Sequence, residues 1–281
     1  MRVFLLDWQV AMPVFAALVV LVQWNKDAAQ RLRWWITQYF LRTVFLVDDR
    51  DLTEGVAARA TRVGGVDISF VKGSETDACA ALVVVDAATL EVVHARCMRV
   101  RLTAPYVPGY LAFREVGFLV NLVAELRETA PELLPDAILV DGNGVLHPNG
   151  FGLACHLGVL CGIPTVGVGK TLHHVDGLTK TTLRALAAGL AARGEHARLV
   201  GRSGRVWGAV VRTTDPAEGN FSPVVVSVGH GVSLDSAVAL VKRCTLKRVP
   251  EPVRQADLRS REWLRQNGTV DGTVDSIHEV K

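Results

Sequence analysis

Residues 62–102, RVGGVDISFVKGSETDACAALVVVDAATLEVVHARCMRVRL, carry the main signal for the fold of this chain. They contain three extended runs, Arg62 to Phe70, Cys79 to Asp86 and Glu91 to Leu102, and each run predicts a β-strand. The turn at Lys72-Gly73-Ser74 and the few residues after Asp86 leave only short connections between the runs. Because short connections join antiparallel neighbours, we expect these strands to form an antiparallel meander.

Helices and short apolar strands alternate after this meander. Residues 113–129 place apolar side chains at helical spacing, and AILV at 137–140 is short and continuous, as a strand buried on both faces should be. We also expect mostly helix at 25–60, helices at 151–161, 179–193, 234–242 and 250–265, and strands at 165–168, 205–213 and 224–228. This order predicts one mixed α/β sheet covered by helices.

Composition limits the class of protein. The chain has 281 residues, 49% of them apolar, and a formal net charge of +3, which excludes a wholly disordered, collagen-like or coiled-coil chain. Its five cysteines are odd in number and include no C-x-x-C pair. That usage argues against a disulfide framework and favours a reducing compartment, so we expect the cytoplasm, with the nucleus or nucleolus as alternatives.

The N-terminal region has its own character. No charged residue occurs from Trp8 to Trp24, WQVAMPVFAALVVLVQW. This length is at the lower limit for crossing a bilayer, and a tryptophan at each end suits the membrane interface. Three interpretations stay open: a membrane segment, a buried helix, and an extension that does not belong to the mature globular unit. We therefore expect an extension at 1–23, a globular domain at 24–265 and a disordered tail at 266–281.

Three carboxylates stand at unusual positions. Asp67 lies inside the first strand, Glu115 opens the helix at 113–129, and Asp141 ends the apolar strand AILV. Each has a structural alternative: an exposed sheet face, the helix dipole and a turn, respectively. Clustered carboxylates repel unless they hold hard cations such as Mg²⁺ or Mn²⁺, so together they indicate a metal site. The basic residues that follow strand ends or loops, where they are able to face a phosphate, are His147, Lys170 and His230.

The motifs around these residues resemble the endonuclease V family. They are VDISF around Asp67, APYVPGYLAFRE at 104–115, LVDGNGVLHPNGFGLACHLG at 139–158, IPTVGVGK ending at Lys170, SVGHGVS around His230 and PEPVRQAD ending at Asp257. The resemblance runs from about residue 63 to residue 265 and is greatest to the animal form, which acts on inosine-containing RNA. Residues 34–45 form an apolar insertion relative to the family pattern.

The resemblance implies an RNase H-like fold, a mixed sheet of three antiparallel strands and then parallel strands, flanked by helices. It implies Asp67, Glu115 and Asp141 as ligands of Mg²⁺, with Mn²⁺ as a substitute. Catalytic positions that contact the scissile phosphate or orient water and metal are His147, Lys170 and His230. Tyr106 corresponds to a wedge beside the modified base. The remaining implied substrate-binding residues are Pro105, Val107, Pro108, Gly109, Leu111, Gly142 and Leu153, and Asp257 is a further acidic position.

The implied activity is hydrolysis of the second phosphodiester bond on the 3′ side of inosine, leaving a 5′-phosphate and a 3′-hydroxyl. Single-stranded inosine RNA is the expected partner, deoxyinosine in DNA is a second substrate, and the protein is expected to be a monomer. Two other classes stay open: a catalytically idle inosine-RNA binding protein, and an adaptor tethered to a membrane through residues 8–24.

Overall fold

The computed structural model describes residues 26–47, 55–215 and 222–267. The chain divides into two compact units, Met1–Thr43 and Val44–Lys281. The described part of the first unit is helix α2 (Lys26–Thr43), as predicted for this part of residues 25–60. It exposes Trp35, Tyr39 and Phe40, and the rings of Trp35 and Tyr39 stack at 6.0 Å.

The second unit is built on one eight-stranded sheet. Its strands are β1 (Arg62–Phe70), β2 (Asp77–Asp86), β3 (Val92–Arg101), β4 (Ala137–Asp141), β5 (Thr165–Gly169), β6 (His196–Val200), β7 (Val206–Val211) and β8 (Val224–His230). Their order in the sheet is β3-β2-β1-β4-β5-β8-β7-β6. The first three strands are antiparallel, β1, β4 and β5 are parallel, and β8, β7 and β6 continue antiparallel. The predicted mixed α/β sheet is confirmed.

The far edge of the sheet differs from the sequence prediction. The predicted parallel part stops at β5, and β8 returns antiparallel to it. Strand β6 was not predicted, because Leu199 is its one fully buried side chain and the strand therefore lacks an apolar pattern. The helix predicted at 179–193 is shorter: α6 (Lys180–Ala188) ends at Gly189.

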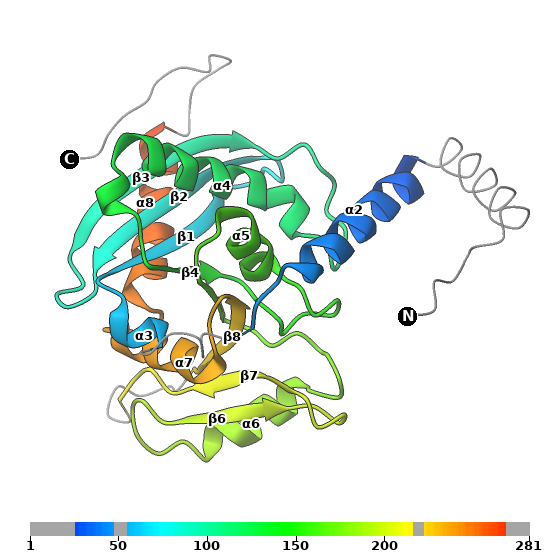
Figure 1. Ribbon diagram of the computed structural model, residues 1–281, viewed down its shortest axis with the longest axis vertical. Coiled ribbons are helices and arrows are strands. Elements are labelled where there is room, and N and C mark those ends of the chain that lie inside the picture. Colours follow the sequence, from blue (N-terminus) through cyan, green and yellow to red (C-terminus); the bar gives the residue numbers. More distant parts are fainter. Residues whose placement is uncertain (1–25, 48–54, 216–221, 268–281) are drawn as a thin grey trace, which may run out of the picture. The chain divides into compact units, whose positions relative to one another are not determined.

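Helices cover both faces of the sheet (Figure 1). They are α3 (Val56–Arg59), α4 (Ala112–Thr129), α5 (Leu153–Cys161), α7 (Leu234–Arg243) and α8 (Glu251–Asn267), with a 3-10 turn at Pro131–Leu133. Helix α4 lies against β2 and α5 against β4, β5 and β8, whereas α8 packs on β1 and β2 from the opposite face. The core between α4 and the sheet contains Val66, Leu82, Leu119 and Leu122.

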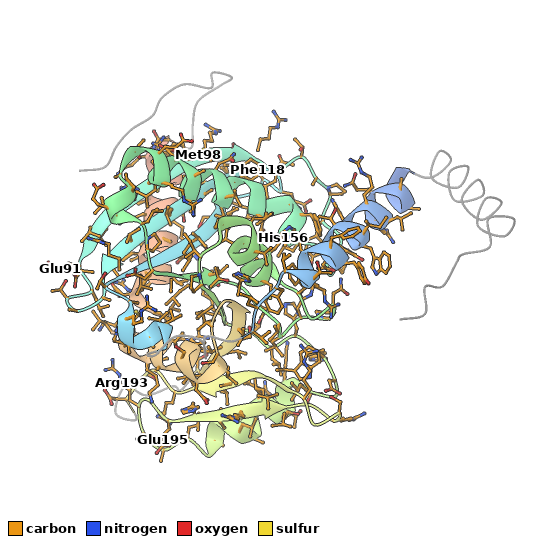
Figure 2. The ribbon with its side chains drawn as sticks, in the orientation of Figure 1. Glu91, Met98, Phe118, His156, Arg193 and Glu195 are labelled. Carbon is orange, nitrogen blue, oxygen red and sulfur yellow. The ribbon has the colours of Figure 1, made fainter. Side chains whose placement is uncertain are left out.

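The periphery of this core is closed by larger side chains. Met98 of β3 and Phe118 of α4, both labelled in Figure 2, are partly buried and pack against it.

Because successive side chains of a strand point to opposite faces, Gly65, Asp67 and Ser69 of β1 face away from this core. They face α8 instead.

Gly65 allows α8 to approach β1 closely. A Cβ atom at residue 65 would lie 2.1 Å from the backbone carbonyl of Pro252, at the start of α8. Any side chain there would push the helix off the strand. Glycine at this position therefore sets the distance between α8 and the face of β1 that carries Asp67.

Some predictions lie outside the described residues. The apolar run at 8–24, the boundary between residues 23 and 24, and residues 268–281 of the predicted tail belong to this group, so each stays a prediction. Gln266 and Asn267, placed in the tail, are instead the last residues of α8. Within the described residues, no helix is long and apolar enough to cross a bilayer. The five cysteines are buried, and no two of them form a disulfide bond.

Candidate active site

The register of the parallel pair β1 and β4 brings two of the predicted carboxylates side by side. The last paired residues are Val66 and Val140, so the next residues along the two strands are Asp67 and Asp141. Strand β4 ends at Asp141 because Gly142 follows with a φ of 145°, a conformation that favours glycine. Both carboxylates therefore stand near the carboxyl ends of buried parallel strands, where open α/β sheets place ligands.

Helix α4 supplies the third carboxylate. Glu115 lies in its first turn, and the side chains of Asp67 and Glu115 are each only 9% exposed. Burial, together with the carboxylates of Asp141 and Asp257, raises the pKa of Asp67 to about 6. Burial, together with the carboxylates of Asp67 and Asp141, raises the pKa of Glu115 to about 7. The three predicted carboxylates are therefore close enough that their charges influence one another's pKa.

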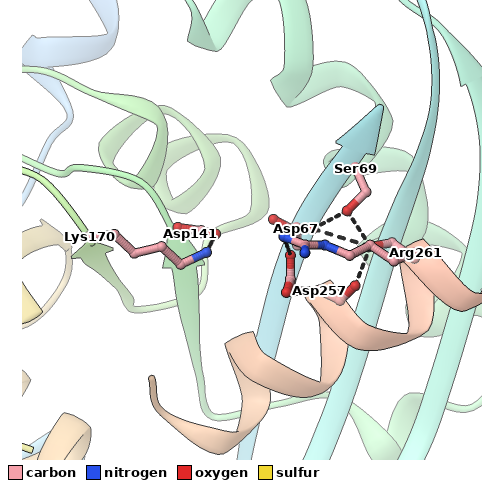
Figure 3. A network of polar contacts seen from close by, with 7 residues as sticks. Asp67, Ser69, Asp141, Lys170, Asp257 and Arg261 are labelled. Carbon is pink, nitrogen blue, oxygen red and sulfur yellow. Dashed lines mark hydrogen bonds and ion pairs between the residues drawn. The ribbon is translucent and has the colours of Figure 1, made fainter. Parts of the chain in front are cut away.

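Lys170 provides a positive charge at this edge of the sheet. It follows directly after β5, and its Nζ lies 2.6 Å from Oδ2 of Asp141 (Figure 3). The same ammonium group opposes the rise in the pKa of Asp67, so it acts on both strands. The ion pair is about one-third exposed on the lysine side, so Lys170 remains accessible to a ligand.

Helix α8 brings a second group of polar side chains to Asp67. Oδ2 of Asp67 accepts hydrogen bonds from Ser69 Oγ at 3.0 Å and from Ser260 Oγ at 3.2 Å. Asp257 of α8 pairs with Arg261 at 2.7 Å on the same side of the site (Figure 3). Sequence reasoning assigned no role to Ser69, Ser260 or Arg261. The spacing of Ser69 two residues after Asp67 is the one signal that indicates a shared face.

A hollow of about 480 Å³ opens between these groups. It is lined by Asp67, Ile68, Ser69, Phe70, Asp141, Lys170, Asp257 and Arg261. Of the predicted catalytic residues, Asp67, Asp141 and Lys170 line it, whereas Glu115, His147 and His230 do not. The hollow therefore joins carboxylates and cations, the two kinds of group that a metal-assisted reaction on a phosphate uses.

The donor atoms of this site fit a hard divalent cation. Carboxylate oxygens are the ligands that Mg²⁺ and Mn²⁺ prefer. Burial first, and repulsion among the carboxylates second, raise the pKa values of Asp67 and Glu115, and a bound cation would oppose both effects. As the side chains stand, no group of three or more His, Cys, Asp or Glu residues in the described part of the chain is placed so that it could hold a metal ion. Lys170 is the cation that Asp141 contacts instead.

The two predicted histidines lie in different surroundings. His147 is 8% exposed, its Nδ1 accepts a hydrogen bond from the Asn149 N–H at 3.2 Å, and its ring lies 5.9 Å from that of His173. Burial, followed by the neighbouring His173, lowers the pKa of His147 to about 4. His230 ends β8, where its Nδ1 accepts a hydrogen bond from the Leu46 N–H at 3.3 Å. Burial lowers the pKa of His230, so both rings are neutral at pH 7.

The predicted wedge lies in the loop between β3 and α4. Tyr106 is 63% exposed, with Pro105 and Pro108 also exposed and Val107 half-buried. The Val107 carbonyl accepts a hydrogen bond from the Tyr110 N–H at 2.9 Å, which closes a turn. The structure therefore presents the Tyr106 ring to solvent rather than to the core.

The residues predicted to form the base pocket come from two loops. Gly109 has a φ of 83°, and its carbonyl accepts a hydrogen bond from Asn149 Nδ2 at 3.2 Å. Leu111 is 38% exposed at the start of α4. In the loop after β4, the Cα of Gly142 faces Leu153, whose Cβ lies 3.9 Å from where a side chain at residue 142 would begin. Asn149 thus joins the loop between β3 and α4, which carries Tyr106 and Gly109, to the loop after β4, which carries Gly142.

Comparison with known proteins identifies a family. The family model described as Endonuclease V matches residues 46–258. The chain is 53% identical over 207 residues to Endonuclease V of Homo sapiens, covering 73% of this chain and 72% of that protein. It is 52% identical over 206 residues to Endonuclease V of Mus musculus, covering 73% of this chain and 60% of that protein.

Solved structures agree with these matches. The catalytic domain of human Endonuclease V superimposes with a TM-score of 0.81 at 46% identity, over 85% of this chain and 97% of that one. Endonuclease V of Ciona intestinalis, in complex with a 24mer DNA containing an inosine followed by a ribo-adenosine, superimposes with a TM-score of 0.76 at 32% identity. That match covers 85% of this chain and 99% of the other.

Proposed function

The chain belongs to the endonuclease V family of nucleases, which hydrolyse phosphodiester bonds, and from this premise we propose that it cleaves single-stranded RNA near inosine with Mg²⁺ as cofactor. Mn²⁺ is the expected substitute and deoxyinosine in DNA the second substrate. Cleavage falls at the second phosphodiester bond on the 3′ side of inosine and leaves a 5′-phosphate and a 3′-hydroxyl. The observation that carries the proposal is the meeting of Asp67, Asp141 and Lys170 in one hollow.

The relatives support the choice of inosine. Endonuclease V of Ciona intestinalis has been solved with DNA in which an inosine precedes a ribo-adenosine. That substrate combines the modified base with a ribonucleotide at the position that follows it. A chain that shares its fold over 85% of its length is therefore expected to take inosine-containing nucleic acid.

In this proposal the carboxylates of Asp67, Glu115 and Asp141 hold the divalent cation. When bound, such a cation activates the attacking water and stabilises negative charge on the leaving oxygen. Lys170 turns from Asp141 toward the scissile phosphate, where it stabilises the more anionic transition state. Asp257 adds a third carboxylate to the hollow, beside Asp67 and Asp141, and its pairing with Arg261 holds it on the α8 side.

The histidines act at the edge of the site. His147 and His230 are neutral and half or fully buried, so each is able to donate one hydrogen bond through the ring nitrogen that is not already accepting. We propose that these donors contact phosphate oxygens or the attacking water.

Base selection uses the two joined loops. Hypoxanthine presents an N1–H donor and an O6 acceptor and lacks the 2-amino group of guanine. Backbone groups of Gly109 and Gly142, with Leu111 and Leu153 against the base edge, would pair with these atoms and exclude the extra amino group. Tyr106 fills the gap that the extruded base leaves in the strand. Extrusion costs least in single-stranded RNA, which favours it as substrate.

A cleavage assay tests this function. RNA oligonucleotides that differ only in inosine or guanosine at one position are incubated with the whole chain in Mg²⁺ or in EDTA, beside a deoxyinosine DNA. We expect the inosine RNA to be cleaved in Mg²⁺ and to stay intact in EDTA, and the guanosine RNA to stay intact in both. Tight binding without cleavage would favour the idle binding protein, and recovery of the expressed chain in the membrane fraction would favour the tethered adaptor. We expect a cytoplasmic monomer.

A further inference from the structure

Two serines bond the same oxygen of Asp67. Ser69 Oγ and Ser260 Oγ lie 3.0 Å and 3.2 Å from Oδ2, and the two hydroxyl oxygens lie 2.8 Å from each other. Ser260 is completely buried and Ser69 is 9% exposed. Within the described residues, these hydroxyls are the hydrogen-bond donors to the Asp67 carboxylate, and both act on Oδ2. The other oxygen, Oδ1, accepts no hydrogen bond from a donor in the described part of the chain.

Counting protons shows that the pair works as a unit. Each hydroxyl has one proton to donate. Ser260 Oγ also lies 3.0 Å from the carbonyl of Asp257, so it has three acceptors within reach. Ser260 has one proton for these three acceptors. When it donates to Asp67, or to Ser69, which then donates to Asp67, a hydroxyl proton points at Oδ2 of Asp67. Losing Ser260 removes either a donor to Oδ2 or the hydroxyl that orients Ser69.

The backbone holds Ser260 in place through the approach at Gly65. Pro252 of α8 packs on the Cα of Gly65, and Ser260 stands over Asp67 and Ser69. The step from Pro252 to Ser260 is about 12 Å along a helix. The step from Gly65 to Ser69 is about 13 Å along a strand. Helix α8 and strand β1 therefore run along each other, with Ser260 fixed at the distance that Gly65 sets.

We propose that Ser260 is a positioning residue for the metal ligand Asp67. Together with Ser69 it occupies Oδ2 and orients the carboxylate so that Oδ1 is the oxygen available to a divalent cation. This inference rests on the proposed metal-dependent function. Hydrogen bonds that orient a metal ligand typically contribute a factor of about 10–100 to metal affinity.

Metal binding by the whole chain tests this role without reference to cleavage. Mn²⁺ is titrated into the parent and into Ser260→Ala, and free Mn²⁺ is measured by electron paramagnetic resonance. We expect the Kd for Mn²⁺ to rise about 10-fold or more in Ser260→Ala, and similarly in Ser69→Ala. The Mg²⁺ concentration that half-saturates cleavage should move in parallel.

Two further variants separate positioning from general stability. Ser236→Ala is the matched control. Ser236 of α7 is also buried, and its Oγ accepts a hydrogen bond from the Ala57 N–H of α3 at 3.0 Å. It should lower the melting temperature about as much as Ser260→Ala and leave the Kd for Mn²⁺ unchanged. Ser260→Thr keeps the hydroxyl and should restore most of the affinity. If its extra methyl prevents folding, the comparison of Ser69→Ala with Ser236→Ala decides between positioning and general stability.

The outcomes are distinct. An unchanged Kd for Mn²⁺ in a folded Ser260→Ala, or an equal loss in Ser236→Ala, overturns the positioning role while leaving the proposed function intact. A parent chain that neither binds Mn²⁺ nor cleaves inosine RNA overturns the proposed function, and the role of Ser260 with it.

Discussion

The carboxylate site and the Tyr106 loop are built in opposite ways. Asp67 and Glu115 are nine-tenths buried on regular elements, and their pKa values are raised by burial and by each other. Tyr106 is 63% exposed on a loop held by two prolines. A change in the first region therefore alters both the chemistry and the stability of the fold, whereas a change in the second alters contact with a ligand alone. The two regions should respond differently to every substitution and to pH.

The largest effect is expected at the carboxylate site. Asp67→Ala removes a proposed metal ligand, and losing about 4 kcal/mol of transition-state stabilisation lowers the rate roughly 10³-fold. Single-turnover cleavage of inosine RNA in Mg²⁺ measures it. Asp77→Ala is the matched control, since Asp77 is a carboxylate of β2 that pairs with Arg99 away from the hollow. Near-normal turnover in Asp67→Ala would remove Asp67 from the metal site.

The next effect is expected at the exposed loop. Stacking of an aromatic ring on a base is worth about 1–3 kcal/mol, so Tyr106→Ala should weaken binding of inosine RNA by roughly one to two orders of magnitude. Tyr106→Phe keeps the ring and should bind nearly as well as the parent. Because Tyr106 is exposed, neither variant should change the melting temperature. A loss of stability without a loss of affinity would show that Tyr106 supports the fold instead.

A third prediction concerns the metal-free protein and pH. The folded-state pKa of Asp67, about 6, lies above its ordinary value of 3.8, so its stabilising protonated form is fully present below about pH 4 and lost as pH rises through 6. The difference between these two pKa values corresponds to roughly 3 kcal/mol in the free energy of unfolding. Asp67→Asn removes the charge and should raise the melting temperature in EDTA by several degrees at pH 8, with little change at pH 4. An equal change at both pH values would contradict the burial of a charged Asp67.

The smallest effect is expected from removing the residues before Val44, which belong neither to the carboxylate site nor to the Tyr106 loop. A chain that begins at Val44 keeps every candidate residue and should cleave at nearly the parent rate. A chain that begins at Asp48 also loses Phe45 and Leu46, which contact His230 through the ring at 6.1 Å and through the backbone N–H. It should cleave more slowly. A folded but inactive chain from Val44 would mean that the first unit contributes to the site.

Much of the fold was predictable because its central strands carry strong local signals. The meander at 62–102 and the apolar strands at 137–140 and 165–168 appear at the predicted places. Strand β6, HARLV, was missed because it is an edge strand that buries little. The direction of β8 could not be read from its sequence, because a continuous apolar run is compatible with either direction.

The site was predictable only in part, for a related reason. Asp67, Glu115 and Asp141 stand out because charges inside apolar elements are costly. Ser260 gives no such signal: a lone serine in a basic helix is ordinary, and its contact with Asp67 arises from the packing of α8 on β1. Arg261 likewise reads as a solvated charge until the helix is placed. That these residues meet follows from tertiary packing rather than from any local pattern.

The contact between Ser260 and Asp67 also sets an order of events during synthesis. The two residues are 193 positions apart in the chain. A ribosome that adds about 5–20 residues per second needs roughly 10–40 s to make that stretch. For all of that time the nascent protein holds Asp67 without the hydroxyl that α8 brings. The surroundings of Asp67 are therefore complete only after α8 has been synthesised and has packed on β1.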